Sequence, residues 1–194
     1  MSGSGFHRPH QSVQPSFPSL VRRPAARPSV FVGRVFRPPG SSNGRNALYL
    51  SQLGFDVTAV DSNANAIQML QSIIAQEGIG TIDPRVYDIN QARLDADYGF
   101  IACTVTLMFL DPRRINAVLA DMQEHTLPGG HNLIVCAMDT PAHPCPVGFP
   151  FTLNESQLST IYQGWEMLKY NEDLGTMHNG AQLQFATMLA RKPV

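Results

Sequence analysis

Apolar residues recur in two patterns from residue 45 onward. Apolar positions three and four residues apart, bounded by capping residues, glycine or proline, are typical of helices that pack on one face. They predict helices over residues 45–53 and 65–77 and one that starts after Asp111-Pro112, and a capping-box pattern at Asn154 and Gln157 predicts a helix through Tyr162. Short runs rich in β-branched residues predict strands at residues 55–61, 85–88, 98–110, 131–138, 165–171 and 182–190.

The alternation of these helices and strands predicts an α/β fold with a mainly parallel sheet. In such a sheet, ligands bind at the carboxyl ends of the strands. The strand over residues 55–61 ends on an acidic residue, Asp61, at such an end.

A glycine turn around Gly40 and Gly44 precedes the first of these helices and lies about twenty residues before Asp61. At this separation an acidic residue can bond the ribose hydroxyls of a nucleotide cofactor that rests on the turn. The absence of a Gly-Lys-Ser/Thr sequence disfavours a phosphate-binding loop, and the incomplete glycine pattern disfavours a dinucleotide site. Residue types alone leave a nucleotide cofactor and a chance turn equally open.

Residues 1–39 differ in composition from the rest of the chain. Arginine is the only one of the residue types Lys, Arg, Asp and Glu that occurs there, and all 15 acidic residues of the chain follow residue 39. Proline and serine are frequent. Such a composition buries too little apolar surface to order a chain, so we expect residues 1–29 to be disordered. The interpretations are a transit peptide, which the prolines oppose, a basic arm for nucleic acid or anionic lipid, a passive tail, or a segment translated out of frame.

The run over residues 30–36 is the candidate for a first strand, although Gly33 and Arg34 interrupt its alternation. We therefore expect residues 30–194 to form the folded domain, with a degraded first strand and loop. The 194 residues are 43% hydrophobic, which suits one globular domain, and no apolar run approaches the roughly 18 residues of a membrane span. The sequence thus predicts neither a membrane nor a nucleic-acid partner.

The chain has 3 cysteines at irregular spacing, too few for a disulfide framework or a zinc site. An odd number of cysteines suits a reducing compartment, so we expect a cytoplasmic protein without a bound metal. Cys103 and Cys136 lie in apolar strand segments and are expected in the core, whereas Cys145 lies between two prolines in a loop.

Six segments match one family in order: NGRNALYLSQLGFDVTAVD, TVTLMFL, GGHNLIVCAMDT, PCPVGFPF, GWEMLKYNEDLG and FATMLARK. Together they closely resemble the TehB family of bacterial tellurite-resistance methyltransferases, over residues 43–194. The resemblance implies a seven-stranded, Rossmann-like class I methyltransferase fold with the last strand antiparallel. It also implies S-adenosyl-L-methionine as cofactor and methyl transfer to tellurite or related chalcogen oxyanions in the cytoplasm.

The resemblance assigns cofactor contacts along the chain. It places Asp61 at the ribose, Asp88 and Ile89 around the adenine, and Thr104 and Val105 beside the sulfonium. The complete set implied for the cofactor is Gly40, Asn43, Gly44, Arg45, Asn46, Asp61, Asp88, Ile89, Thr104 and Val105.

The first loop departs from the family pattern. Pro38 stands where the family has an acidic residue that holds the methionine end of the cofactor, and Ser41 and Ser42 stand where it has Cys and Gly. A serine forced to positive φ at position 42 would cost about 1 kcal/mol or more.

Tellurite brings its own nucleophilic lone pair, so the reaction requires groups that hold an oxyanion rather than a general base. His178 matches a histidine of the family and is the first candidate for that catalytic role. The Cys145 thiolate is a candidate ligand for a soft chalcogen, and Phe149 and Phe151 are candidates for the wall of the substrate pocket.

Two alternatives to a tellurite methyltransferase stay open at this point. One is an inactive, methyltransferase-like derivative with impaired cofactor binding, and the other is a general methyltransferase of small thiols or halides. The residues also leave open whether the protein forms a homodimer.

Overall fold

A computed structural model describes residues 29–34, 44–176 and 180–194. Three of the predicted site residues, Gly40, Asn43 and His178, lie outside the described residues. The same holds for the departures from the family pattern between Pro38 and Ser42, and for the arm up to residue 28.

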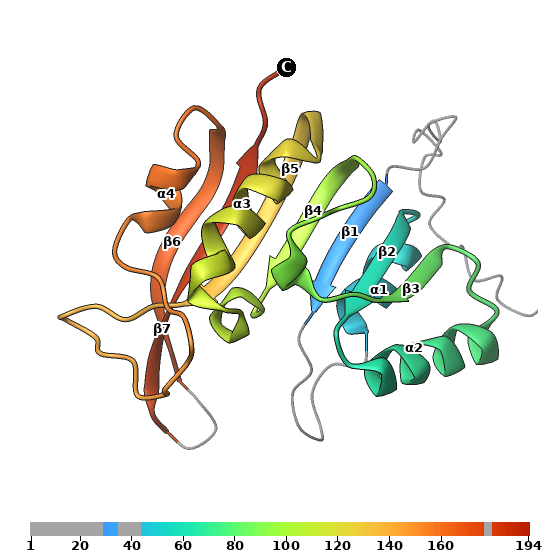
Figure 1. The fold of residues 1–194 in the computed structure, drawn as a ribbon, viewed down its shortest axis with the longest axis horizontal. Coiled ribbons are helices and arrows are strands. Elements are labelled where there is room, and N and C mark those ends of the chain that lie inside the picture. The colour runs from blue at the N-terminus through green and yellow to red at the C-terminus, as the bar shows by residue number, and fades with distance from the viewer. Residues whose placement is uncertain (1–28, 35–43, 177–179) are drawn as a thin grey trace, which may run out of the picture.

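One seven-stranded sheet forms the centre of the fold, with the strand order β3-β2-β1-β4-β5-β7-β6 (Figure 1). β7 runs antiparallel to both of its neighbours, and the pairs from β3 to β5 are parallel. The predicted α/β fold, mainly parallel with the last strand antiparallel, is confirmed. The strands are β1 (Ser29–Arg34), β2 (Asp56–Asp61), β3 (Ile82–Val86), β4 (Tyr98–Thr104), β5 (Thr126–Ala137), β6 (Glu166–Thr176) and β7 (Gln182–Arg191).

Helices cover both faces of this sheet. α1 (Arg45–Gln52) and α2 (Ala64–Glu77) pack against one face, in a smaller core with β1, β2 and β3. α3 (Ile115–Glu124) and α4 (Gln157–Ile161) pack against the opposite face, over the half of the sheet formed by β4 to β7 (Figure 1). All four predicted helices are present. Asp111 caps the turn before α3 as expected, because its carboxylate accepts the Arg113 N–H at 2.9 Å.

The first strand predicted at residues 30–36 is present as β1 (Ser29–Arg34) and lies inside the sheet, between β2 and β4. Ser29 already pairs with Asp56, so the strand begins one residue inside the arm that we expected to be disordered. Gly33 is the reason for the broken alternation in β1. A Cβ there would lie 2.8 Å from Ile89 Cδ1, so the glycine leaves the space that Ile89 fills.

Four predicted strands have wrong boundaries, and one of them is β6, which runs on to Thr176 instead of ending at residue 171. The apolar run 98–110 is a strand only as far as Thr104, because the chain then turns into a 3₁₀ helix, η2 (Leu107–Phe109), whose residues pack in the core. The third strand covers 82–86 instead of 85–88, since Pro84 is tolerated at the edge of a sheet. β5 starts at Thr126, ahead of the proline and glycines that we expected to precede it.

No helix in the described ranges is long and apolar enough to cross a membrane.

Candidate functional site

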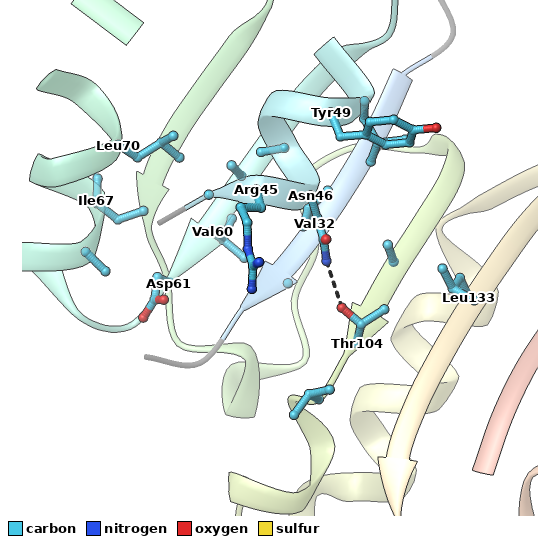
Figure 2. A pocket seen from close by; sticks show the side chains of 18 of the residues that line it. Val32, Arg45, Asn46, Tyr49, Val60, Asp61, Ile67, Leu70, Thr104 and Leu133 are labelled. Atoms are coloured by element: carbon cyan, nitrogen blue, oxygen red, sulfur yellow. Dashed lines mark hydrogen bonds between the residues drawn. The ribbon is translucent and has the colours of Figure 1, made fainter. Parts of the chain in front are cut away.

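A cavity of about 590 Å³ lies beside α1, on the face of the sheet that α1 and α2 cover, and reaches the carboxyl ends of β1, β2 and β4 (Figure 2). It occupies the edge where the parallel sheet was expected to bind its ligand. Six of the predicted cofactor residues line it together: Gly44, Arg45, Asn46, Asp61, Thr104 and Val105.

Gly44 places the N-terminus of α1 at the cavity. Its φ of 73° is in the left-handed region, and a Cβ at this position would lie 2.6 Å from Leu70 Cδ1 of α2. A glycine therefore suits this position for two reasons, the left-handed backbone angle and the close packing of α1 on α2. The first N–H groups of α1 have no partners within the helix, so this end of the cavity favours a negatively charged or carbonyl-bearing ligand.

Asp61 is the buried acidic residue of the cavity, only 2% exposed. Its Oδ1 accepts the N–H of Asn63 at 2.9 Å, and Asn63 in turn caps α2 by accepting the N–H of Asn65 at 2.9 Å. The turn from β2 into α2 thus holds the carboxylate in place. In Figure 2 the side chains of Asp61 and Arg45 extend toward the same end of the cavity.

Asn46 and Thr104 connect the two sides of the cavity. Asn46 Nδ2 donates a hydrogen bond of 3.0 Å to Thr104 Oγ1, drawn as the dashed line in Figure 2. Val105 follows Thr104 at the tip of β4 and also lines the cavity, with a positive φ of 56°. The hydrogen bond between Asn46 and Thr104 links the first turn of α1 to the end of β4.

Much of the cavity wall is apolar, and it was not predicted from the sequence as part of a site. The apolar face of the helix over 65–77 was expected only to pack on the sheet, yet Ile67 and Leu70 also face the cavity. Tyr49 of α1, 63% exposed, lies at another part of the wall. The residues of this wall include Val32, Tyr49, Leu50, Val60, Ile67, Leu70, Phe100 and Leu133.

Asp88 and Ile89, implied to surround the adenine, follow β3 and do not line the cavity. The Asp88 carboxylate caps the 3₁₀ helix η1 (Ile89–Gln91) by accepting the N–H of Asn90 at 3.0 Å. The Ile89 side chain is buried against Gly33. Their contact with a cofactor stays a prediction.

Cys145, Phe149 and Phe151 lie in the loop between β5 and α4 and do not line the cavity either. Cys145 Sγ donates to the Val147 carbonyl at 3.2 Å, and the Phe149 ring meets Phe109 edge-on, with centroids 5.3 Å apart. These contacts give the loop a defined conformation. Their role in a substrate pocket stays a prediction, as does that of His178.

All three cysteines lie among the described residues and are free thiols. Cys103 and Cys136 are buried in the core as predicted. Burial raises the pKa of the Cys103 thiol to about 12 and also raises that of Cys136. Both thiols are therefore protonated at neutral pH and chemically inert.

Residues 32–189 match the family model described as "Tellurite resistance protein TehB". The chain belongs to the TehB family. A curated relative from Haemophilus influenzae (strain 10810), named "Probable S-adenosyl-L-methionine-dependent methyltransferase TehB", is 46% identical over 159 residues, which are 79% of this chain and 55% of the relative. The chain thus spans about half the length of the TehB relatives that it matches.

Solved structures agree with this family assignment. The crystal structure of TehB from Haemophilus influenzae has a TM-score of 0.77 and 43% identity, with 87% of this chain and 58% of that chain covered. A structure titled as a SAM-dependent methyltransferase from Methanosarcina mazei has a TM-score of 0.66 at 14% identity, with 87% and 93% of the two chains covered. The second likeness shows that this chain shares the fold of that methyltransferase.

Proposed function

We propose that this chain binds S-adenosyl-L-methionine in the cavity beside α1 and transfers its methyl group to tellurite or a related chalcogen oxyanion. The observation that carries the proposal is that Asp61, the N-terminus of α1 and the tip of β4 all face one cavity. Membership of the TehB family and the name of the curated relative support the same cofactor.

Each end of the cavity suits one part of the cofactor. Asp61 at the end of β2 would accept hydrogen bonds from both ribose hydroxyls, as an acidic residue at this position can. Gly44, Arg45 and Asn46 would hold the methionine end, because its carboxylate matches the free N–H groups of a helix N-terminus. Thr104 and Val105 would lie beside the sulfonium, and Asp88 with the Ile89 backbone would contact the adenine.

The acceptor would be held at the same edge of the sheet. His178, between the ends of β6 and β7 in sequence, is the candidate donor to the oxyanion, and the loop with Cys145, Phe149 and Phe151 is the candidate wall. The free thiols support a reducing compartment, so we place this reaction in the cytoplasm.

Bound S-adenosyl-L-methionine supplies an electrophilic methyl group on a positively charged sulfur. The chalcogen lone pair would take up this methyl group, and the electron pair of the former bond between sulfur and carbon would stay on sulfur. The chain's own residues contribute by orienting the two reactants in line and by excluding water, which can lower such a barrier by about 7–11 kcal/mol.

Calorimetric titration of the chain with S-adenosyl-L-methionine tests the cofactor, and radiolabelled methyl transfer to tellurite, selenite, a thiol or a halide tests the acceptor. We expect micromolar binding and transfer to tellurite. Asp61→Asn should weaken binding at least about tenfold, which corresponds to about 1.4 kcal/mol. Asp97→Asn is the matched control, since Asp97 is exposed ahead of β4.

Absence of binding by the folded chain would overturn the proposal in favour of an inactive derivative. Binding with transfer to thiols or halides but not to tellurite would keep the cofactor and replace the acceptor.

A further inference from the structure

Val105 has a backbone conformation that is unfavourable for its side chain. Three non-glycine residues in the described ranges have positive φ, namely Ala92, Val105 and Ser156, and of these Val105 lines the cavity. A β-branched residue at φ 56° is a genuine outlier, because Cβ crowds the following carbonyl. Such strain persists where surrounding contacts impose it, and it clusters at binding sites.

Hydrogen bonds on both sides of Val105 impose this conformation. The Val105 N–H donates to the Val135 carbonyl of β5 at 2.7 Å. The Thr106 hydroxyl lies 3.2 Å from the Thr104 carbonyl and 3.2 Å from the Gly33 carbonyl, and it can donate its one proton to either carbonyl. Thr106 has 0% exposure, so water does not compete for this hydroxyl.

The contact between the Thr106 hydroxyl and the Gly33 carbonyl links the two chain segments beyond the last backbone pair of β1 and β4. The registered pairs of these two strands end at Gly33 and Cys103. The Thr106 hydroxyl therefore joins the end of β1 to the chain just beyond β4, at the place where both border the cavity. The next residues, Leu107 and Met108, are fully buried and anchor the chain on the other side of the sheet.

We infer that Thr106 is a positioning residue, whose hydroxyl holds the Thr104–Val105 tip of β4 in its strained conformation and so shapes the cofactor cavity. The inference rests on the proposed function. Thr106 does not line the cavity, so its effect on a ligand passes through Thr104 and Val105. The strain at Val105 is then the energetic cost of a preformed cavity wall.

The test uses calorimetric titration of the whole chain with S-adenosyl-L-methionine. Thr106→Val keeps the shape of the side chain and removes the hydroxyl, and we expect affinity to fall at least about fivefold. Thr106→Ser keeps the hydroxyl and should bind within about twofold of the unmodified chain. A purely structural role would lower Tm and leave the affinity of the folded protein unchanged.

A second pair of variants tests the strain itself and does not depend on Thr106→Val folding. Glycine ordinarily destabilises a protein relative to alanine, but at positive φ the order reverses. We expect Val105→Gly to melt about 2–4 °C above Val105→Ala. We also expect the two variants to bind S-adenosyl-L-methionine with affinities within about twofold of each other, because the bonds to the Val135 and Gly33 carbonyls still hold the tip.

The outcomes separate this inference from the proposed function. No binding by the unmodified chain would overturn both. Binding by the unmodified chain, with equal affinity in Thr106→Val, would overturn the inference alone. An affinity loss in Thr106→Ser equal to that in Thr106→Val, or a lower Tm for Val105→Gly than for Val105→Ala, would also overturn it.

Discussion

The side-chain amide of Asn46 in α1 donates a 3.0 Å hydrogen bond to the Thr104 hydroxyl at the end of β4. These residues are 58 positions apart in sequence, and their bond crosses the cavity that we assign to the cofactor. It connects the N-terminal end of α1 to the tip of β4, so a ligand that shifts one of these segments also shifts the other.

Removing either partner of this bond is expected to weaken cofactor binding. Asn46→Ala and Thr104→Val should each lower the affinity for S-adenosyl-L-methionine about 3–10-fold, since a hydrogen bond is worth about 0.5–1.5 kcal/mol. The two side chains share one hydrogen bond. The double variant should therefore lose little more affinity than the single variant with the larger effect. Titration calorimetry measures the cycle, with Asn116→Ala on the exposed side of α3 as control. Additive losses would show that the two residues act independently.

Gly44→Ala is expected to impair both folding and cofactor binding. The substitution combines a left-handed backbone, φ 73°, with a Cβ 2.6 Å from Leu70 Cδ1. Gly78→Ala is the matched control, because Gly78 has φ 64° but nothing within 4 Å of the added Cβ. We expect Gly78→Ala to cost about 1 kcal/mol and Gly44→Ala about 1–3 kcal/mol more in urea unfolding. Equal costs would mean that Leu70 moves aside freely.

Lys192 stabilises the end of α3, although it lies 68 residues away from Glu124 in sequence. Its Nζ donates to the carbonyls of Gln123 at 2.7 Å, Glu124 at 3.2 Å and Thr126 at 2.8 Å. A cation at this position satisfies helix-terminal carbonyls and opposes the helix dipole.

We expect Lys192→Met to reduce the free energy of unfolding by about 1.5–3 kcal/mol, because hydrogen bonds from a charged group are lost. Lys169→Met on β6 is the matched control, since Lys169 is exposed, and its expected effect is within about 0.5 kcal/mol. Chemical denaturation measures both. A cost for Lys192→Met as small as for the control would show that water replaces the ammonium without loss.

The cysteines should differ sharply in reactivity. Burial raises the pKa of Cys103 to about 12, so at pH 8 this thiol stays protonated as well as inaccessible. Cys136 is equally buried, whereas Cys145 is partly exposed. A chromogenic disulfide reagent at pH 8 should therefore titrate one thiol in the native chain and all three after unfolding. Cys145→Ser should react with none while folded, and fast reaction of that variant would show that the core opens.

Local patterns were sufficient for most of the elements and for part of the site. The 3- and 4-residue spacings located α1, α2 and α3, and a capping-box pattern located α4, whereas the 3₁₀ helices were missed. The distance from the glycine turn to Asp61 was compatible with a nucleotide cofactor, and the resemblance to the family decided for one. The errors fall where local pattern and tertiary packing disagree. The run after Thr104 is as apolar as a strand, but its apolar side chains are required in the core beneath the sheet, so the chain turns there.

The amino-acid sequence by itself determined the α/β class, the family and the carboxyl-end location of the site, because each depends on hydrophobic period, capping residues and short motifs. Only the tertiary structure decided which side chains share the cavity. It brought Asn46 to Thr104 and Thr106 to Gly33, and it directed Ile89 into the core instead of the cavity. These relationships depend on strand order and on close packing between distant segments, which no local pattern encodes.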